Sequence, residues 1–189
     1  MNKYDFLVIG SGPAGRRAAI QAAKLGRSVL VVENRPRVGG VSVHTGTIPS
    51  KTLRETVLNL TGWRERCFYG RAYRVKKEIE GSDLRARLRM TLEHEIEVLE
   101  LQFNRNGVRT LTGSARFLDP HRVIVTSNVD GASTEEVFQA ERILIAVGTV
   151  PFRPDTIPFN DCNVLDSDTL IAMPHVPRSL TVAGAGVIG

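Results

Sequence analysis

Six residues near the start of the chain have a spacing suited to holding a phosphate group, namely Gly10, Ser11, Gly12, Pro13, Ala14 and Gly15. They follow a short apolar run and precede a stretch with helical periodicity, which places the glycines in a turn between a strand and a helix. The first glycine permits the tight turn, the second lets a pyrophosphate approach the backbone, and the third allows the helix to pack closely on the strand. The N-terminus of that helix offers free N–H groups and a positive dipole end to a diphosphate. The motif therefore predicts a dinucleotide site.

An acidic residue stands at the place where such a site needs one. Glu33 ends the next apolar run, about 20 residues beyond the glycines, and Asn34, which follows it, is also expected to contact the cofactor. A carboxylate there would accept hydrogen bonds from the hydroxyl groups of an adenosine ribose. The strand, the glycine turn, the helix and the acid follow one another with the order and spacing of a dinucleotide-binding unit. This pattern does not distinguish FAD from NAD.

A second glycine-rich segment, residues 39–51, reads GGVSVHTGTIPSK. It resembles the redox motif of the flavoprotein disulfide reductases, such as lipoamide dehydrogenase and glutathione reductase, whose two redox cysteines lie beside the flavin. Ser42 and Thr47 occupy those two positions here. A hydroxyl group cannot carry two electrons as a disulfide does, so electrons that reach a flavin would have no dithiol relay to leave by.

With the rest of this segment intact, the chain most resembles the soluble, Si-specific NAD(P)+ transhydrogenases, from about residue 4 to its last residue. The resemblance implies FAD as cofactor and NADPH and NAD+ as substrates, with hydride passing through the flavin. It also implies a homo-oligomeric parent protein, joined through a C-terminal domain. Two alternatives stay open for the activity: a disulfide reductase-like enzyme and a diaphorase. For these residues alone, a non-catalytic FAD-binding module is the alternative.

The resemblance also assigns roles to individual residues. Ser42, Thr47 and Lys51 would lie next to the flavin, with the Lys51 ammonium beside the reactive edge of the ring. A histidine in this motif suggests a base, but hydride transfer needs no proton relay there, and we expect His44 to be structural. The remaining residues expected to contact FAD are Gly39, Gly40, Gly46, Gly113, Ala115, Ala146, Val147 and Gly148.

The chain ends on a second set of glycines with the same spacing, Gly184, Gly186 and Gly189. In the resembled family this motif opens the NAD(P) domain. No helix, acid or arginine follows the last glycine, so we expect an incomplete nicotinamide site and no turnover by these residues alone.

The hydrophobic pattern supplies the elements that must position these residues. Branched apolar runs at 4–9 and 28–33 flank a helix at 13–25 as a βαβ unit. A second helix is expected from Pro49 to Gly62. A third, capped by Ser82, carries an apolar stripe of Leu84, Leu88, Leu92, Ile96, Leu99 and Phe103.

Beyond that helix, apolar residues recur at every second position, as they do in strands. We expect a small antiparallel meander of strands at 108–111, 115–118, 122–126 and 137–138, a return to the parallel sheet at 142–147, and a last strand at 179–183. The predicted fold class is α/β: a Rossmann-like FAD-binding domain with a parallel sheet, helices and an antiparallel meander. The expected divisions are the FAD-binding domain at 1–150, a proline-rich connector at 151–178 and the beginning of an NAD(P)-binding domain at 179–189.

Composition narrows the function classes. The chain has 189 residues, 42% hydrophobic and 24% charged, as in globular proteins, with no secretory signal and no apolar run long enough to cross a membrane. A cytoplasmic protein is expected. The net charge of +5 comes mainly from residues 64–89 and is followed by several glutamates, as on a solvated helix face, so no nucleic-acid partner is expected. Cys67 and Cys162 have neither metal-ligand nor disulfide-framework spacing.

Overall fold

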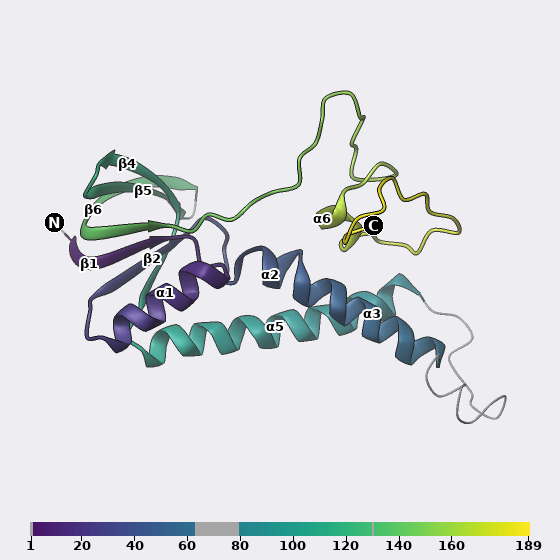
Figure 1. Cartoon of the computed structure of the whole chain (residues 1–189), viewed down its shortest axis with the longest axis horizontal. Helices are drawn as coiled ribbons and strands as arrows, with labels where there is room; N and C mark the ends of the chain where they lie inside the picture. The colour runs from purple at the N-terminus through teal and green to yellow at the C-terminus, as the bar shows by residue number, and fades with distance from the viewer. Residues whose placement is uncertain (1, 63–79, 130) are drawn as a thin grey trace. The chain divides into compact units, whose positions relative to one another are not determined.

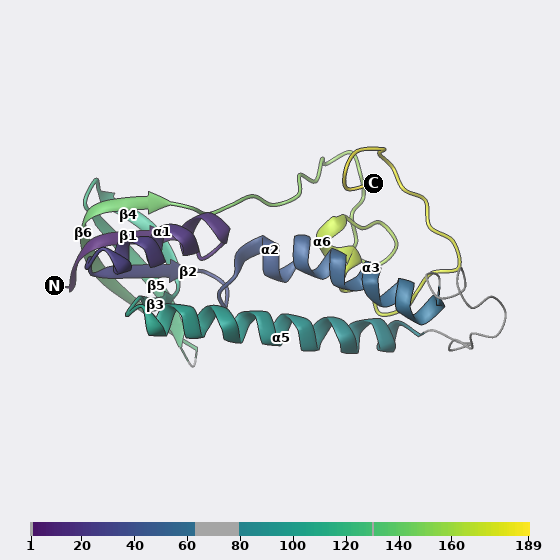
Figure 2. The same cartoon turned by 60° about the horizontal axis from the view of Figure 1, so that its bottom comes forward.

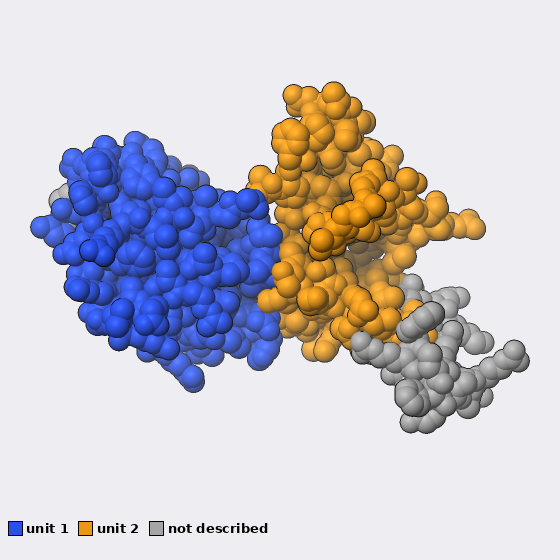
Figure 3. Space-filling model, in the orientation of Figure 1, with its two compact units in different colours: residues 1–43, 94–149 blue, residues 44–93, 150–189 orange. Residues whose placement is uncertain are grey.

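The computed structural model describes residues 2–62, 80–129 and 131–189. The chain divides into two compact units, one made of residues 1–43 and 94–149 and the other of residues 44–93 and 150–189 (Figure 3). The elements, in chain order, are β1 (Asn2–Ile9), α1 (Pro13–Lys24), β2 (Val29–Glu33), α2 (Gly40–His44), α3 (Thr47–Thr61), α5 (Gly81–Arg105), β3 (Arg109–Thr112), β4 (Ser114–Asp119), β5 (Arg122–Val129), β6 (Ala132–Ile145) and α6 (Ser167–Leu170).

The described strands of the first unit form one six-stranded sheet in the order β3-β2-β1-β6-β5-β4. Figure 1 labels all of these strands except β3, which Figure 2 labels. Strand β1 pairs in parallel with β2 and with the second part of β6, and β2 pairs in parallel with β3. The first part of β6 pairs antiparallel with β5, which pairs antiparallel with β4. The mixed α/β class and the combination of a parallel sheet with an antiparallel meander are therefore as predicted.

The parallel strands are covered on both faces. On one face they pack against the meander in a core made of Leu7, Leu30, Val32, Val123, Val125, Phe138 and Ala140. On the other face helix α1 packs on β1 and β2, where Ala19, Val8 and Val31 are completely buried. This burial explains why β1 and β2 read as continuous apolar runs and not as alternating ones.

Local sequence explains where the helices of the βαβ unit and the apolar stripe begin and end. Pro13 is the first helical residue of α1, where its missing N–H costs nothing. The chain leaves α1 through Gly26 and leaves α3 through Gly62, and both glycines have a positive φ. Along α5, the residues of the predicted stripe that become buried are Leu88, Ile96, Leu99 and Phe103.

Two strand predictions were wrong. Residues 108–111 were expected in the meander, but β3 pairs in parallel with β2, because the long helix α5 provides the crossover that a parallel pair requires. Residues 137–138 and 142–147 were expected as separate strands, but they belong to one strand, β6, which ends at Ile145. This single strand joins the meander to the parallel sheet.

The other differences lie at element ends. Helix α3 begins at Thr47, two residues before Pro49, and the short helix α2 precedes it. Ser82 lies inside α5, not at its cap. Residues 179–183 form no strand: none of the described strands pairs with them, and a strand has no internal hydrogen bonds to hold it alone. The division into domains that we expected from the sequence stays a prediction.

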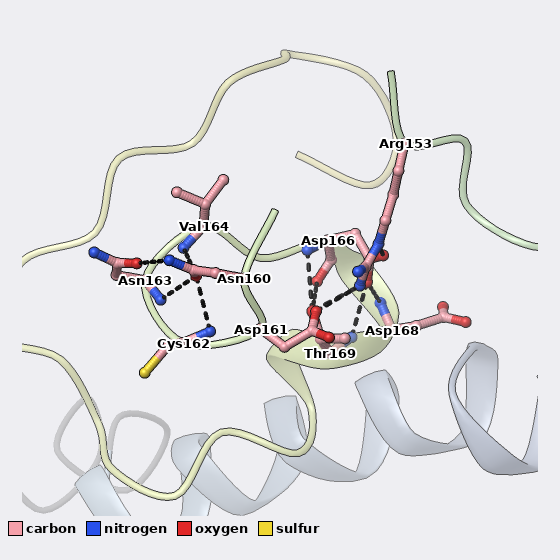
Figure 4. Close-up of polar contacts among 9 residues, drawn as sticks. All are labelled: Arg153, Asn160, Asp161, Cys162, Asn163, Val164, Asp166, Asp168 and Thr169. Carbon is pink, nitrogen blue, oxygen red and sulfur yellow. Dashed lines mark hydrogen bonds and ion pairs between the residues drawn. The ribbon is translucent and has the colours of Figure 1, made fainter. Parts of the chain in front are cut away.

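The second unit contains α3, the first turns of α5, and irregular chain held by polar contacts (Figure 4). Arg153 pairs with Asp161 at 2.6 Å and with Asp166 at 2.7 Å, and its guanidinium lies over the ring of Phe159. Asp166 also caps α6 by accepting hydrogen bonds from the amides of Asp168 and Thr169. These contacts stabilise a segment with little regular structure.

Helices α3 and α5 are the two longest of the described helices, and both can be followed in Figure 2. No described helix is long and apolar enough to span a membrane.

Candidate dinucleotide-binding site

The carboxyl ends of four strands meet at one edge of the sheet, because β1, β2, β3 and the last part of β6 run in the same direction. The amide of Gly10 donates to the carbonyl of Val32 at 2.8 Å. The amide of Ala146 donates to the last residue of β1, and that of Gly113 to the last residue of β2, each at 2.8 Å. Segments far apart in the sequence are thus joined where open α/β sheets bind ligands.

The outer two glycines of the first motif are required by close backbone contacts. Gly10 has φ +103°, and a Cβ there would collide with the carbonyl of Ala146. A Cβ on Gly15 would collide with the carbonyl of Gly10 and lie 3.0 Å from a methyl group of Val8. The turn and the tight packing of α1 on β1 therefore both depend on glycine.

Gly12 differs from them because its surroundings are open. A Cβ on Gly12 would meet only the Cα of Gly40, at an ordinary 4.0 Å. Gly12 is the N-cap of α1, and no side chain caps the helix. The first-turn amides of α1, which have no intrahelical acceptor, are accordingly available to an anion.

Glu33 is buried and binds both loops beside it. Its Oε2 accepts hydrogen bonds from the amide of Ser11 at 2.9 Å and from the hydroxyl of Ser11 at 2.5 Å. Its Oε1 accepts one from the amide of Arg35 at 3.0 Å. A carboxylate has about four acceptor positions, so Oε1 retains capacity for a further donor.

A cavity of about 220 Å³ opens beside this carboxylate. Its lining includes Glu33 and Arg35, the residue whose amide binds Oε1. Phe103 and Leu111 give it apolar walls, and Glu100 and Asn104 add polar groups. A cavity with an apolar wall and several polar groups, one of them a carboxylate acceptor, fits the ring and hydroxyl groups of an adenosine.

A larger hollow of about 610 Å³ lies elsewhere in the same unit, among Lys3, Asp5, Ser28, His121 and Glu141. These residues lie near the start of β1 and β2, at the opposite edge from the glycine turn. Parallel sheets bind ligands at the carboxyl ends of their strands, so the smaller cavity is the better candidate.

The glycines of the second segment lie directly against the first motif. The amide of Gly39 donates to the hydroxyl of Ser11 at 2.9 Å. Gly40 has φ +62°, and a Cβ on it would lie 2.7 Å from the Cα of Gly12. Ser42 follows in α2, with its hydroxyl 3.2 Å from the carbonyl of Gly39.

Gly113 is explained by packing. A Cβ there would lie 2.7 Å from a methyl group of Val125 and 2.8 Å from the hydroxyl of Ser127. Its amide is already bonded to β2, so an adenine contact would have to use other atoms of this loop. Four further residues expected at the site follow these strand ends closely in the sequence. Three of them are exposed, namely Asn34, Val147 and Gly148, and Ala115 is half-buried.

Some of the predicted site residues lie outside the first unit. Gly46, Thr47 and Lys51 belong to the second unit, where Gly46 is the N-cap of α3 and Thr47 and Lys51 are exposed. His44 is half-buried at the end of α2. The flavin-proximal roles expected for Ser42, Thr47 and Lys51 stay predictions.

The last glycines repeat the backbone contacts of the first motif although no strand or helix flanks them. Gly184 has φ +122°, and a Cβ on Gly189 would collide with the carbonyl of Gly184 and lie 3.3 Å from a methyl group of Val182. Gly10, Gly15 and Val8 have the same relationship. The turn of the second motif is therefore formed within these residues.

Several residues at the site could not be found from motifs. Arg35 contributes a backbone amide, and Glu100 and Asn104 reach the cavity from α5. Glu100 also forms a two-point ion pair with Arg37, at 2.7 Å and 3.0 Å. The apolar stripe placed Phe103 on the buried face of a helix, but not beside a ligand.

Arg16, the fourth residue of α1, is in an unfavourable environment. Its Nε is buried and has no hydrogen-bond partner in the described structure. Burial lowers the pKa of its guanidinium, the charge of Arg17 lowers it further, and Glu95 opposes them. A cation also interacts unfavourably with the N-terminal end of a helix dipole.

The structure describes one of the two cysteines. Cys162 is a free, exposed thiol in the second unit, and Cys67 lies outside the described residues. Within residues 2–62, 80–129 and 131–189, no group of three or more His, Cys, Asp or Glu side chains could hold a metal ion.

Comparison with known proteins gives a consistent result. Residues 4–189 match the model of the family described as pyridine nucleotide-disulphide oxidoreductase. Proteins named soluble pyridine nucleotide transhydrogenase, from Mycobacterium bovis (strain BCG / Pasteur 1173P2) and Mycobacterium tuberculosis (strain ATCC 25177 / H37Ra), are 48% identical over 189 residues. One of the same name from Vibrio vulnificus (strain YJ016) is 38% identical over 195 residues. Each match covers the whole of this chain and 40% of the relative's length.

Proposed function

Because the chain belongs to the pyridine nucleotide-disulphide oxidoreductase family, we propose that it is the FAD-binding part of a transhydrogenase that moves hydride from NADPH to NAD+ through the flavin. The relatives that carry the name transhydrogenase support the activity. The observation that carries the cofactor assignment is the meeting of the glycine turn, the open N-terminus of α1 and the Glu33 carboxylate at one edge of the sheet.

The residues present fit the dinucleotide part of FAD. The open side of Gly12 would leave room for a diphosphate, which the free amides of α1 would bind. The Oε1 atom of Glu33 would accept a ribose hydroxyl, and the cavity beside Phe103 would take the adenine. When bound, FAD supplies the hydride chemistry, and the protein supplies binding and orientation.

The absence of a dithiol from the redox motif selects among the activities of the family. Ser42 and Thr47 hold hydroxyl groups where a disulfide reductase has its two thiols. A reduced flavin would therefore return its electrons to a nicotinamide nucleotide. The Lys51 ammonium, on α3, is proposed to favour electron density on the ring.

The nicotinamide site is proposed to begin at the second glycine motif. The close approach of Gly189 to the carbonyl of Gly184, as in the first motif, supports this assignment. A cytoplasmic location and a homo-oligomeric assembly are parts of the same proposal, and the word soluble in the relatives' names supports the first.

The test is made on the full-length protein to which these residues belong. Purified protein should show flavin absorbance and should transfer hydride from NADPH to thionicotinamide adenine dinucleotide, followed as an absorbance change. It should not reduce lipoamide or glutathione disulfide. Efficient disulfide reduction that persists in a Cys67→Ser/Cys162→Ser variant would contradict the proposal, because no thiol relay would then explain it.

A further inference from the structure

The hydroxyl of Ser11 lies between the two glycine segments and is bonded to both sides. It donates to the Oε2 of Glu33 at 2.5 Å and accepts from the amide of Gly39 at 2.9 Å. Ser11 is only 1% exposed and Glu33 is 6% exposed, so water has little access to compete with these bonds. The side chain of Ser11 is thus committed to the protein and is not a direct contact for a cofactor.

We propose that Ser11 is a positioning residue, which transmits the charge of the Glu33 carboxylate to the amide of Gly39 and so holds the two glycine segments together before a cofactor binds. The identity of that cofactor as FAD rests on the proposed function. The hydrogen-bonded chain itself consists of protein groups alone.

The carboxylate of Glu33 sets the direction of the hydrogen bonds in this row. An ionised carboxylate only accepts, so the Ser11 hydroxyl has to point its hydrogen at Glu33 and leave a lone pair for the Gly39 amide. Hydrogen bonds in a row polarise one another, and a charged acceptor at the end strengthens the row. A glutamine at position 33 would lose both the charge and this fixed direction.

The hydrogen-bonded chain also gives the two carboxylate oxygens of Glu33 different roles. Oε2 takes both donors of Ser11, whereas Oε1 takes only the amide of Arg35 among the described donors. Oε2 is therefore the structural oxygen, and Oε1 is the one left for a ligand. Fixing Gly39 also fixes Gly40, whose backbone touches Gly12 beside the proposed diphosphate position. A site already arranged in this way loses less conformational freedom when a ligand binds.

The first measurement needs no substitution. Amide hydrogen exchange of the apoprotein, followed by nuclear magnetic resonance, should show the Gly39 amide strongly protected. In Ser11→Ala that exchange should accelerate at least about tenfold, since a hydrogen bond linked to a charge is lost. In Ser133→Ala, which removes an exposed hydroxyl from β6, it should not change. An unprotected Gly39 amide in the wild type, or one that Ser11→Ala leaves within twofold, would overturn the proposal.

The second measurement tests whether Ser11 acts through Glu33. Ser11→Ala should weaken FAD binding by about tenfold in the wild-type background but by less than twofold in a Glu33→Gln background. If Ser11→Ala weakened FAD binding by the same factor in both backgrounds, Ser11 would act independently of Glu33 and would only fill space. If the wild type binds no FAD at all, the proposed function fails, and the exchange of Gly39 alone decides the role of Ser11.

Discussion

The contact between Gly12 and Gly40 is asymmetric. A Cβ built on Gly40 would lie 2.7 Å from the Cα of Gly12, whereas a Cβ built on Gly12 would lie 4.0 Å from the Cα of Gly40. The two glycines therefore serve different purposes. Gly40 is required by the fold, while the open side of Gly12 is available for a ligand to approach.

Substitutions in the first motif should separate folding from binding. We expect Gly12→Ala to leave the melting temperature nearly unchanged but to weaken FAD binding at least about tenfold, because the new methyl group occupies the diphosphate position. Gly15→Ala should weaken binding and also lower the free energy of unfolding by about 1–3 kcal/mol, because its methyl group collides with the carbonyl of Gly10. FAD titration and thermal unfolding of both variants make the comparison. Unchanged FAD affinity in Gly12→Ala would show that the diphosphate does not bind at this turn.

Glu33→Ala should weaken FAD binding more than any substitution at His44. Losing a hydrogen bond to a charged acceptor costs about 1.5–3 kcal/mol, or about ten- to a hundredfold in affinity. The variant should also be less stable without FAD, because the donors of Ser11 and Arg35 lose their buried acceptor. Titration of the apoprotein with FAD measures the affinity and thermal unfolding without FAD measures the stability, each with His44→Ala in parallel. Equal affinities in the wild type and Glu33→Ala would exclude Glu33 as the ribose ligand.

The second unit should lose stability in acid through Asp166. The hydrogen bond from Arg153 is the main cause that holds the pKa of Asp166 at about 2, below its ordinary value of 3.8, and hydrogen bonds from Thr169 also contribute. A carboxyl with a lowered native pKa stabilises the fold above pH 3.8, and this contribution is lost as the pH falls toward 2. In Asp166→Asn the unfolding midpoint should depend less on pH in that window. Asp155→Asn, at an exposed aspartate, is the control, and identical pH profiles for the two variants would contradict the prediction.

Arg16→Met should stabilise the protein. The substitution keeps most of the side-chain length but removes a buried Nε without a partner and a cation near the N-terminus of α1. An unsatisfied buried donor costs about 1–3 kcal/mol, and a gain of about 1 kcal/mol corresponds to about 2–4 °C for a domain of 150–250 residues. Differential scanning calorimetry should show this increase for Arg16→Met but not for Arg17→Met, whose side chain is exposed. A decrease in the melting temperature would mean that the attraction to Glu95 outweighs both costs.

The sequence by itself determined the parts of this protein that depend on neighbouring residues. The turn at Gly10, the start of α1 at Pro13 and the acid at the end of β2 follow from local conformational preference and hydrophobic period, and they could be predicted. The replacement of the redox cysteines by Ser42 and Thr47 is also readable without coordinates.

Only the tertiary structure decided which distant segments meet. The pairing of β3 with β2, the continuity of β6 through both parts of the sheet, and the entry of Glu100 and Asn104 into the cavity all depend on contacts between residues far apart in the chain. The bonds from Ser11 to Glu33 and Gly39 are of the same kind. Hydrophobic period reports which face of an element is buried, but it carries no information about the partner on that face, and a hydrogen bond between loops leaves no period at all.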